Sequence, residues 1–106
     1  MQLTIGLNRE GMPSIDKETA KKDIIAYAAA LFGYGSIVEG GGVYTMKDGS
    51  ITIESSICFM LCVNSVNYDD IKTKVLYMAD IFKKWYSQES VLIEEFGPSG
   101  YKWEFI

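Results

Sequence analysis

The amino-acid sequence predicts an α+β fold in which two helices cover one face of an antiparallel β-sheet. Three observations predict it. Apolar residues alternate with polar ones over several short segments, recur at helical spacing over two longer ones, and an Asp-Gly pair separates two alternating segments. The chain has 106 residues, of which 48% are hydrophobic, and no linker composition divides it. We therefore expect one folded domain over residues 1–106.

A change of period marks the first strand and the first helix. Apolar residues occupy every second position of residues 2–8, which is typical of a half-buried strand. Over residues 17–32 they recur three and four positions apart, as in an amphipathic helix. Asp16 directly precedes this segment, and we expect its carboxylate to cap the helix.

A β-hairpin is predicted around Asp48-Gly49, because tight turns need a positive φ that such pairs readily adopt. Residues 36–46 precede the pair and residues 51–63 follow it, and both segments have the character of strands. A two-residue loop would place apolar residues opposite apolar residues. The predicted pairs are Lys47 with Ser50, Met46 with Ile51, Thr45 with Thr52, Tyr44 with Ile53, and Val43 with Glu54.

The second half of the chain adds another helix and two strands. Residues 68–86 carry an apolar stripe, with Asn67 as the expected N-cap. Residues 91–96 and 101–106 have strand character and are separated by a Gly-Pro-Ser-Gly turn. The order is then βαββαβ, the ferredoxin-like arrangement, with an additional C-terminal strand. The sheet face without helices would be apolar and aromatic, so we expect a homo-oligomer, either a dimer or a higher assembly.

Composition argues against several classes of function. The net charge of −4 argues against binding duplex nucleic acid, which needs a basic face. Without histidine, Ser-His and Cys-His nucleophile pairs are excluded, and we predict no metal, no cofactor, no catalytic residue and no enzyme. A small enzyme that uses Glu54 or Asp69 stays an alternative, although a solvated glutamate is the simpler interpretation. With neither a long apolar stretch nor a signal peptide, we expect a cytoplasmic protein without a membrane span.

Short features suggest where a ligand would bind. The run Gly40–Gly42 would let a ligand or a second subunit approach the backbone, although a β-bulge explains it as well. Arg9 is the only arginine and could hold a phosphate or a carboxylate, although it could equally be a surface residue. Tyr101, Trp103 and Phe105 alternate onto one face of the last strand, where they would stack on a base or pack within or between subunits.

Three further segments form a pattern: Thr4-Ile5-Gly6-Leu7-Asn8, Gly42-Val43-Tyr44-Thr45 with Lys47-Asp48-Gly49, and Gln88-Glu89-Ser90-Val91. Together they resemble a family of small phage proteins, the first-described class of anti-Thoeris sponges. The resemblance implies a non-catalytic oligomer that sequesters a cyclic ADP-ribose-type signalling nucleotide between subunits, without cleaving it, and so blocks bacterial anti-phage defence. The ligand-binding residues it implies are Asn8, Arg9, Tyr44, Gln88 and Glu89. The alternative is a protein–protein interaction or structural module with no small-molecule ligand.

Overall fold

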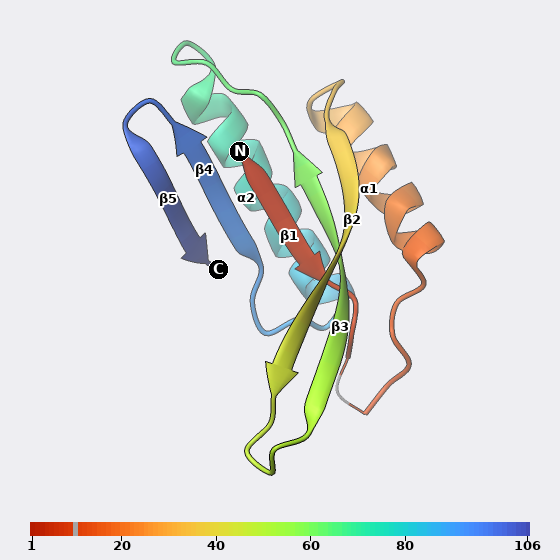
Figure 1. Ribbon diagram of the computed structural model, residues 1–106. Helices are drawn as coiled ribbons and strands as arrows, with labels where there is room; N and C mark the ends of the chain where they lie inside the picture. The colour runs from red at the N-terminus through yellow and green to blue at the C-terminus, as the bar shows by residue number, and fades with distance from the viewer. Residues whose placement is uncertain (10) are drawn as a thin grey trace.

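The computed structural model describes residues 1–9 and 11–106, apart from the side chain of Tyr44. Figure 1 shows the helices lying behind a twisted sheet. Within the described residues, neither helix combines the length and the apolar composition needed to cross a bilayer. The elements are β1 (Gln2–Gly6), α1 (Lys17–Leu31), β2 (Ser36–Thr45), β3 (Ile51–Met60), α2 (Tyr68–Trp85), β4 (Leu92–Gly97) and β5 (Gly100–Phe105).

All neighbouring strands of the sheet are antiparallel. Their order across the sheet is β2-β3-β1-β4-β5. The first four strands have the order of the split βαβ fold, and β5 pairs with the outer side of β4. The predicted α+β class, the ferredoxin-like order and the additional C-terminal strand are therefore confirmed.

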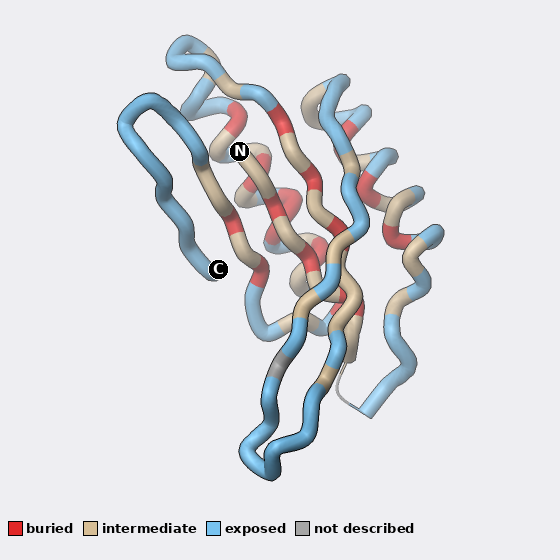
Figure 2. Tube along the Cα trace, viewed as in Figure 1, coloured by how far each residue is buried: buried red, intermediate tan, exposed pale blue. Residues whose placement is uncertain are grey.

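The hydrophobic core lies between the sheet and the two helices. Alternate strand residues point into it, so that Leu3 and Ile5 of β1 lie beside Ile57 and Phe59 of β3. Figure 2 shows these buried positions along the central strands and the facing sides of the helices. From α2 the core receives five buried residues at helical spacing: Ile71, Val75, Met78, Ala79 and Phe82. The helices thus cover one face of the sheet, and we call the other the open face.

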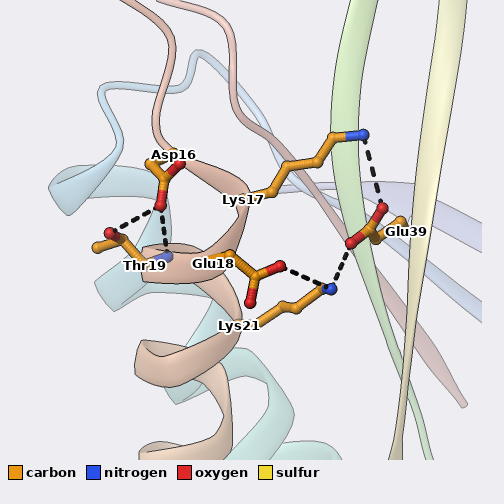
Figure 3. A network of polar contacts seen from close by, with 6 residues as sticks. All are labelled: Asp16, Lys17, Glu18, Thr19, Lys21 and Glu39. Atoms are coloured by element: carbon orange, nitrogen blue, oxygen red, sulfur yellow. Dashed lines mark hydrogen bonds and ion pairs between the residues drawn. The ribbon is translucent and has the colours of Figure 1, made fainter.

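Asp16 caps α1 as the sequence predicts. Its carboxylate accepts a hydrogen bond from the backbone N–H of Thr19 at 3.0 Å. Figure 3 shows that the same turn is tied to the sheet, because Lys17 and Lys21 both form ion pairs with Glu39 of β2. The hydrogen bond from Lys21 is the largest cause that lowers the pKa of Glu39. Because exposed ion pairs add little stability, we assign the two pairs with Glu39 the role of orienting α1 against the edge strand β2.

The start of α2 differs from the prediction. Asn67 occupies the N-cap position, but its side chain makes no capping hydrogen bond. Its amide oxygen instead accepts from the backbone N–H of Asn64 at 3.0 Å, and the side chain of Asn64 accepts from Val66 and Asn67 in return. The two asparagines close a local turn on each other, which is an alternative to capping that short polar side chains offer.

The predicted register of the β2–β3 hairpin is wrong by one residue. The carbonyl of Met46 accepts from the N–H of Gly49 at 2.9 Å, and its N–H donates to Ser50 at 2.8 Å, which leaves a three-residue loop. Gly49 has a φ of 87°, as expected for a three-residue loop that ends in a bulge. The shift places a glycine instead of a valine opposite Glu54. The observed pairs are Thr45 with Ile51, Tyr44 with Thr52, Val43 with Ile53, and Gly42 with Glu54.

Two exposed apolar surfaces flank the body of the molecule. The β2–β3 hairpin projects beyond the rest of the sheet in Figure 1. On it Val43, Ile51 and Ile53 are each at least 68% exposed, so the protomer does not bury them, and we call them the apolar arm. The second surface, the aromatic band, lies on β4 and β5 and consists of Phe96, Tyr101, Trp103 and Phe105.

Candidate functional site

A cavity of about 500 Å³ lies on the open face, where β1 ends and the loop between α2 and β4 crosses the end of the sheet. Figure 1 is viewed from the open face, with the helices behind it. All five strands and this loop contribute to the cavity, which lies within the usual size range of small-molecule sites. Its lining residues are Thr4, Gly6, Asn8, Gly41, Gly42, Glu54, Ser56, Ser87, Gln88, Glu89, Ser90, Leu92 and Phe105.

The loop after α2 is held by the way in which that helix ends. The N–H of Gln88 donates to the carbonyl of Lys83 at 2.9 Å, and the N–H of Ser87 donates to Lys84 at 3.3 Å. Ser87 has a φ of 52°. This is a Schellman cap with a serine where glycine is usual. A non-glycine residue in this conformation costs about 1 kcal/mol or more, so the loop carries local strain at the cavity wall.

The side chain of Gln88 is fixed against the end of β1. Its amide nitrogen donates to the carbonyl of Asn8 at 2.8 Å and to the carbonyl of Tyr86 at 3.0 Å. The side chain also lies over Gly6, where an added Cβ would come within 2.5 Å of the Gln88 Oε1. An added side chain at Gly6 would therefore displace the Gln88 amide from its two hydrogen bonds, which make Gln88 a preorganised wall of the cavity.

Asn8 joins β1 to β3 beyond the last backbone pair. Its Oδ1 accepts from the N–H of Ser55 at 3.1 Å, and its Nδ2 donates to the carbonyl of Ile53 at 3.3 Å. The side chain thus replaces a backbone partner for β3. Its polar atoms are engaged within the protein, so its contribution to the cavity is the shape of the wall.

The charge of the cavity comes from two carboxylates. Among the described residues that line it, Glu54 and Glu89 are the only charged ones. Neither forms an ion pair with another described residue. Glu54 is half-buried on β3, and a Cβ added at the facing Gly42 would have no neighbour within 4 Å. Two carboxylates without a counter-charge favour a cationic ligand over a phosphate.

The structure brings together three of the five residues predicted as a ligand site. Asn8, Gln88 and Glu89 line the cavity. Arg9 is not among the lining residues, and its Nε donates to the carbonyl of Pro13 at 2.9 Å. Tyr44 pairs with Thr52 through the backbone, but its side chain lies outside the described part. Six further lining residues were not predicted from the sequence, although the polar positions of the strand alternation were an available signal for Thr4 and Ser56. The six are Thr4, Gly6, Ser56, Ser87, Ser90 and Leu92.

A larger cavity, of about 880 Å³, lies between the β3–α2 connection and the β4–β5 turn. Its carboxylate, Glu95, already binds Lys72 at 2.9 Å and accepts from the hydroxyl of Tyr68. The N-terminal ammonium at its edge donates to the carbonyl of Leu61. Glu95 and the N-terminal ammonium thus have partners within the protein, and Lys102, the other charged lining residue, would repel a cation, so we take the smaller, acidic cavity as the candidate site.

Tyr86 connects the loop of the site to the core between the helices. Its ring is buried, and its hydroxyl donates to Asp23 of α1 at 2.8 Å. Burial is the largest cause that raises the pKa of Tyr86 above its ordinary value, and the hydrogen bond to Asp23 raises it further. A group with a raised folded-state pKa stabilises the protein fully below its unfolded pKa, about 10 for tyrosine, and this stabilisation is lost as the pH rises from there towards the folded-state pKa.

The change Tyr86→Phe is expected to lower the free energy of unfolding by about 1.5 kcal/mol at pH 7, because Asp23 loses a partly buried hydrogen bond. Above pH 10 the wild type should lose stability more steeply than the variant. Urea unfolding between pH 7 and pH 11 measures both effects. Tyr77→Phe, at an exposed position of α2, is the control. Equal slopes for wild type and Tyr86→Phe above pH 10 would contradict the assignment.

Two solved structures have a similar fold. One is a phage SAM lyase in complex with S-methyl-5'-thioadenosine, and the other is a phage SAM lyase in the apo state. Each is 24% identical in sequence, with a TM-score of 0.75 for the complex and 0.74 for the apo state. Each match covers 99% of this chain and 85% of the other. No protein-family profile and no curated protein matches the sequence.

These comparisons correct the functional prediction. Both similar structures are of an enzyme, so the predictions of a non-catalytic sponge and of a protein that is not an enzyme are wrong. The physical reason lies in the cavity, where Glu54 and Glu89 would repel the phosphates of a cyclic ADP-ribose-type signal. The alternative of a module without a small-molecule ligand gains no support, since one of the two similar structures holds a nucleoside.

Proposed function

We propose that this protein is a lyase that acts on S-adenosylmethionine (SAM) and releases S-methyl-5'-thioadenosine. The observation that carries the proposal is the acidic cavity, lined by Glu54 and Glu89 with no cationic lining residue among the described ones. SAM carries a permanent positive charge on its sulfonium sulfur, which such a cavity attracts. The similar fold of a SAM lyase that binds S-methyl-5'-thioadenosine supports the same substrate.

The bond that breaks follows from the product. The sulfonium of SAM carries a methyl group, the 5' carbon of adenosine and Cγ of the methionine part. S-methyl-5'-thioadenosine keeps the first two, so the bond from sulfur to Cγ breaks and its electron pair stays on sulfur. Cγ then forms a bond with an oxygen of the substrate's own carboxylate, which closes a five-membered lactone of homoserine. No proton has to move, so the reaction needs no histidine base.

The protein's task in such a reaction is to bind and to orient the substrate. The attack is intramolecular, because the carboxylate and Cγ belong to the same substrate molecule. A site that holds the carboxylate oxygen in line with the bond from Cγ to sulfur lowers the activation free energy of this attack substantially. Glu54 is placed to bind the sulfonium, and its contact weakens when sulfur becomes neutral, which favours release of the product. Gln88 and Asn8 give the cavity a wall fixed by hydrogen bonds.

We also propose that a second copy of the chain covers the open side of the cavity. The aromatic band lies on the open face and reaches the cavity at Phe105. The apolar arm extends β2 and β3 beyond the body, with its exposed side chains on the face opposite to Glu54, where it offers a second contact. Exposed apolar surfaces of this kind usually mark interfaces. A neighbouring copy would also exclude water from the reacting carbon.

Light scattering on the purified protein tests this assembly. We expect the mass of a dimer or a higher oligomer for the wild type, and a lower mass for Ile53→Lys, which puts a charge in the apolar arm. Val66→Lys is the matched control, because Val66 is 94% exposed but lies outside both apolar surfaces. A wild type that is monomeric at high concentration would contradict the proposal.

The reaction itself is tested by incubating the protein with SAM and following the products by mass spectrometry. We expect S-methyl-5'-thioadenosine and homoserine lactone to appear in equal amounts. In H₂¹⁸O the first-formed lactone should contain no ¹⁸O, because both of its oxygens come from the substrate carboxylate. Intact SAM after long incubation would contradict the lyase, and homoserine labelled with ¹⁸O at Cγ would indicate attack by water instead.

A further inference from the structure

The cavity has an apolar side opposite its acidic side. Leu92 of β4 and Phe105 of β5 are paired across neighbouring strands, and both line the cavity. Glu54 lies on β3, and the order β3-β1-β4-β5 puts three strand spacings between β3 and β5. At about 4.8 Å for each spacing the separation across the sheet is about 14 Å. The strand pairs put Phe105 level with Cys58, so Glu54 also lies about 13 Å further along the sheet. The two backbone positions are therefore about 20 Å apart, a span that the two side chains and an extended nucleoside with its sulfonium arm can fill together.

Phe105 presents an aromatic surface that the protein does not cover. It is 60% exposed, although it borders a cavity. The neighbouring Trp103 meets it edge-on, with ring centroids 5.6 Å apart and an interplanar angle of 77°. An exposed ring at the wall of a polar cavity is suited to stacking on a flat heterocycle. Phe105 is also the only aromatic residue among the described lining residues.

Both neighbours of Phe105 along the chain are fixed. Glu104 points to the helix side of the sheet and binds Lys72 of α2 at 2.8 Å. Ile106 exchanges two backbone hydrogen bonds with Val91, each of 3.0 Å. Strand β5 lies at the edge of the sheet. It is nevertheless held in place directly before and directly after Phe105, so the Phe105 ring belongs to a defined wall of the cavity.

From this geometry we infer that Phe105 is the specificity-determining residue for the base: the adenine ring of the substrate stacks on Phe105, and the sulfonium points towards Glu54. The inference rests on the proposed function and adds the orientation of the ligand to it. Lys72 holds β5 through Glu104 from the opposite face of the sheet.

Titration calorimetry with S-methyl-5'-thioadenosine tests the inference by binding alone. Phe105→Leu keeps an apolar side chain but removes the flat ring, and we expect about a tenfold loss of affinity. Phe105→Trp should retain the affinity. Tyr77→Leu is the matched control, because Tyr77 is a similarly exposed ring on α2 that lies outside this cavity and outside both apolar surfaces. We expect its affinity to stay within about twofold of the wild type.

The outcomes separate the two proposals. If the wild type binds S-methyl-5'-thioadenosine and Phe105→Leu binds it equally well, the stacking inference is wrong and the proposed function stands. If the wild type binds neither this nucleoside nor SAM, both are wrong. The circular-dichroism spectrum and the mass of Phe105→Leu should match those of the wild type, since the exposed ring contributes little to the core and leucine keeps the aromatic band apolar. A Phe105→Trp variant that loses affinity as strongly as Phe105→Leu would also overturn the stacking role.

Discussion

Replacing Glu54 by glutamine is expected to weaken the binding of SAM by about 30-fold or more, and to lower kcat/KM by less, because sulfur loses charge on the way to the transition state. The substitution keeps the size of the side chain but removes its charge. A contact between a carboxylate and a cation in a partly buried site contributes about 2–3 kcal/mol, which corresponds to about 30- to 150-fold. Glu54 is half-buried and has no ion-pair partner among the described residues, so its charge is available to the ligand.

The pattern of the loss distinguishes charge recognition from a general defect of the site. The product carries no charge on sulfur, so its affinity should change by less than about threefold in Glu54→Gln, whereas the KM for SAM should rise. Glu94→Gln is the matched control, because Glu94 lies on the same face, accepts from Tyr101 at 2.6 Å and does not line the cavity. Steady-state kinetics and product inhibition measure both quantities. Full activity of Glu54→Gln would remove Glu54 from the site.

Much of the fold follows from local signals in the sequence. Alternation and helical spacing predict each element because burial on one face imposes the period, and Asp16 predicts the start of α1 because capping is a local interaction. The hairpin register could not be predicted in the same way. Asp48-Gly49 is compatible with both two- and three-residue loops, and both registers pair apolar residues on one face. The choice between the two registers depends on the backbone hydrogen bonds of Met46, which the amino-acid types in the turn do not determine.

The error of one residue in the predicted hairpin register also explains why the sequence did not reveal the candidate site. In the predicted register Val43 lies opposite Glu54, and a valine there would fill the space that the cavity occupies. In the observed register the partner is Gly42, so the carboxylate has an open neighbour. The solvated surface glutamate expected from sequence is thus a half-buried residue at a cavity. The hydrogen bond from the Gln88 side chain to the carbonyl of Asn8 joins residues 80 positions apart. It therefore depends on the topology of the fold, which local sequence patterns do not give.

The functional prediction failed for a different reason. The resemblance to sponges depends on short segments, of which Asn8, Gln88 and Glu89 do lie together at one cavity. Such segments indicate where the backbone must turn or approach closely, as Gly6 does beneath Gln88. They do not determine the sign of the local charge. That sign depends on which charged residues converge in space, and here Arg9 lies outside the lining while Glu54 lies within it.

The largest effect on stability is expected for Gly35→Ala, in the connection between α1 and β2. Gly35 has a φ of 149°, which L-residues rarely adopt. An added Cβ would also lie 2.2 Å from Cε2 of Phe59. Phe59 is 2% exposed and stacks on Phe32 with centroids 5.7 Å apart, so its ring has no free space to enter. Backbone strain and overpacking together should lower the free energy of unfolding by about 3 kcal/mol.

The neighbouring Gly33 separates the two causes. Its φ of 78° is also unfavourable for alanine, but an added Cβ there meets no atom within 4 Å. Gly33→Ala should therefore cost only the backbone term, about 1 kcal/mol. Urea unfolding of both variants gives the difference, which measures the contact with Phe59. Equal losses would mean that Phe59 moves aside without cost.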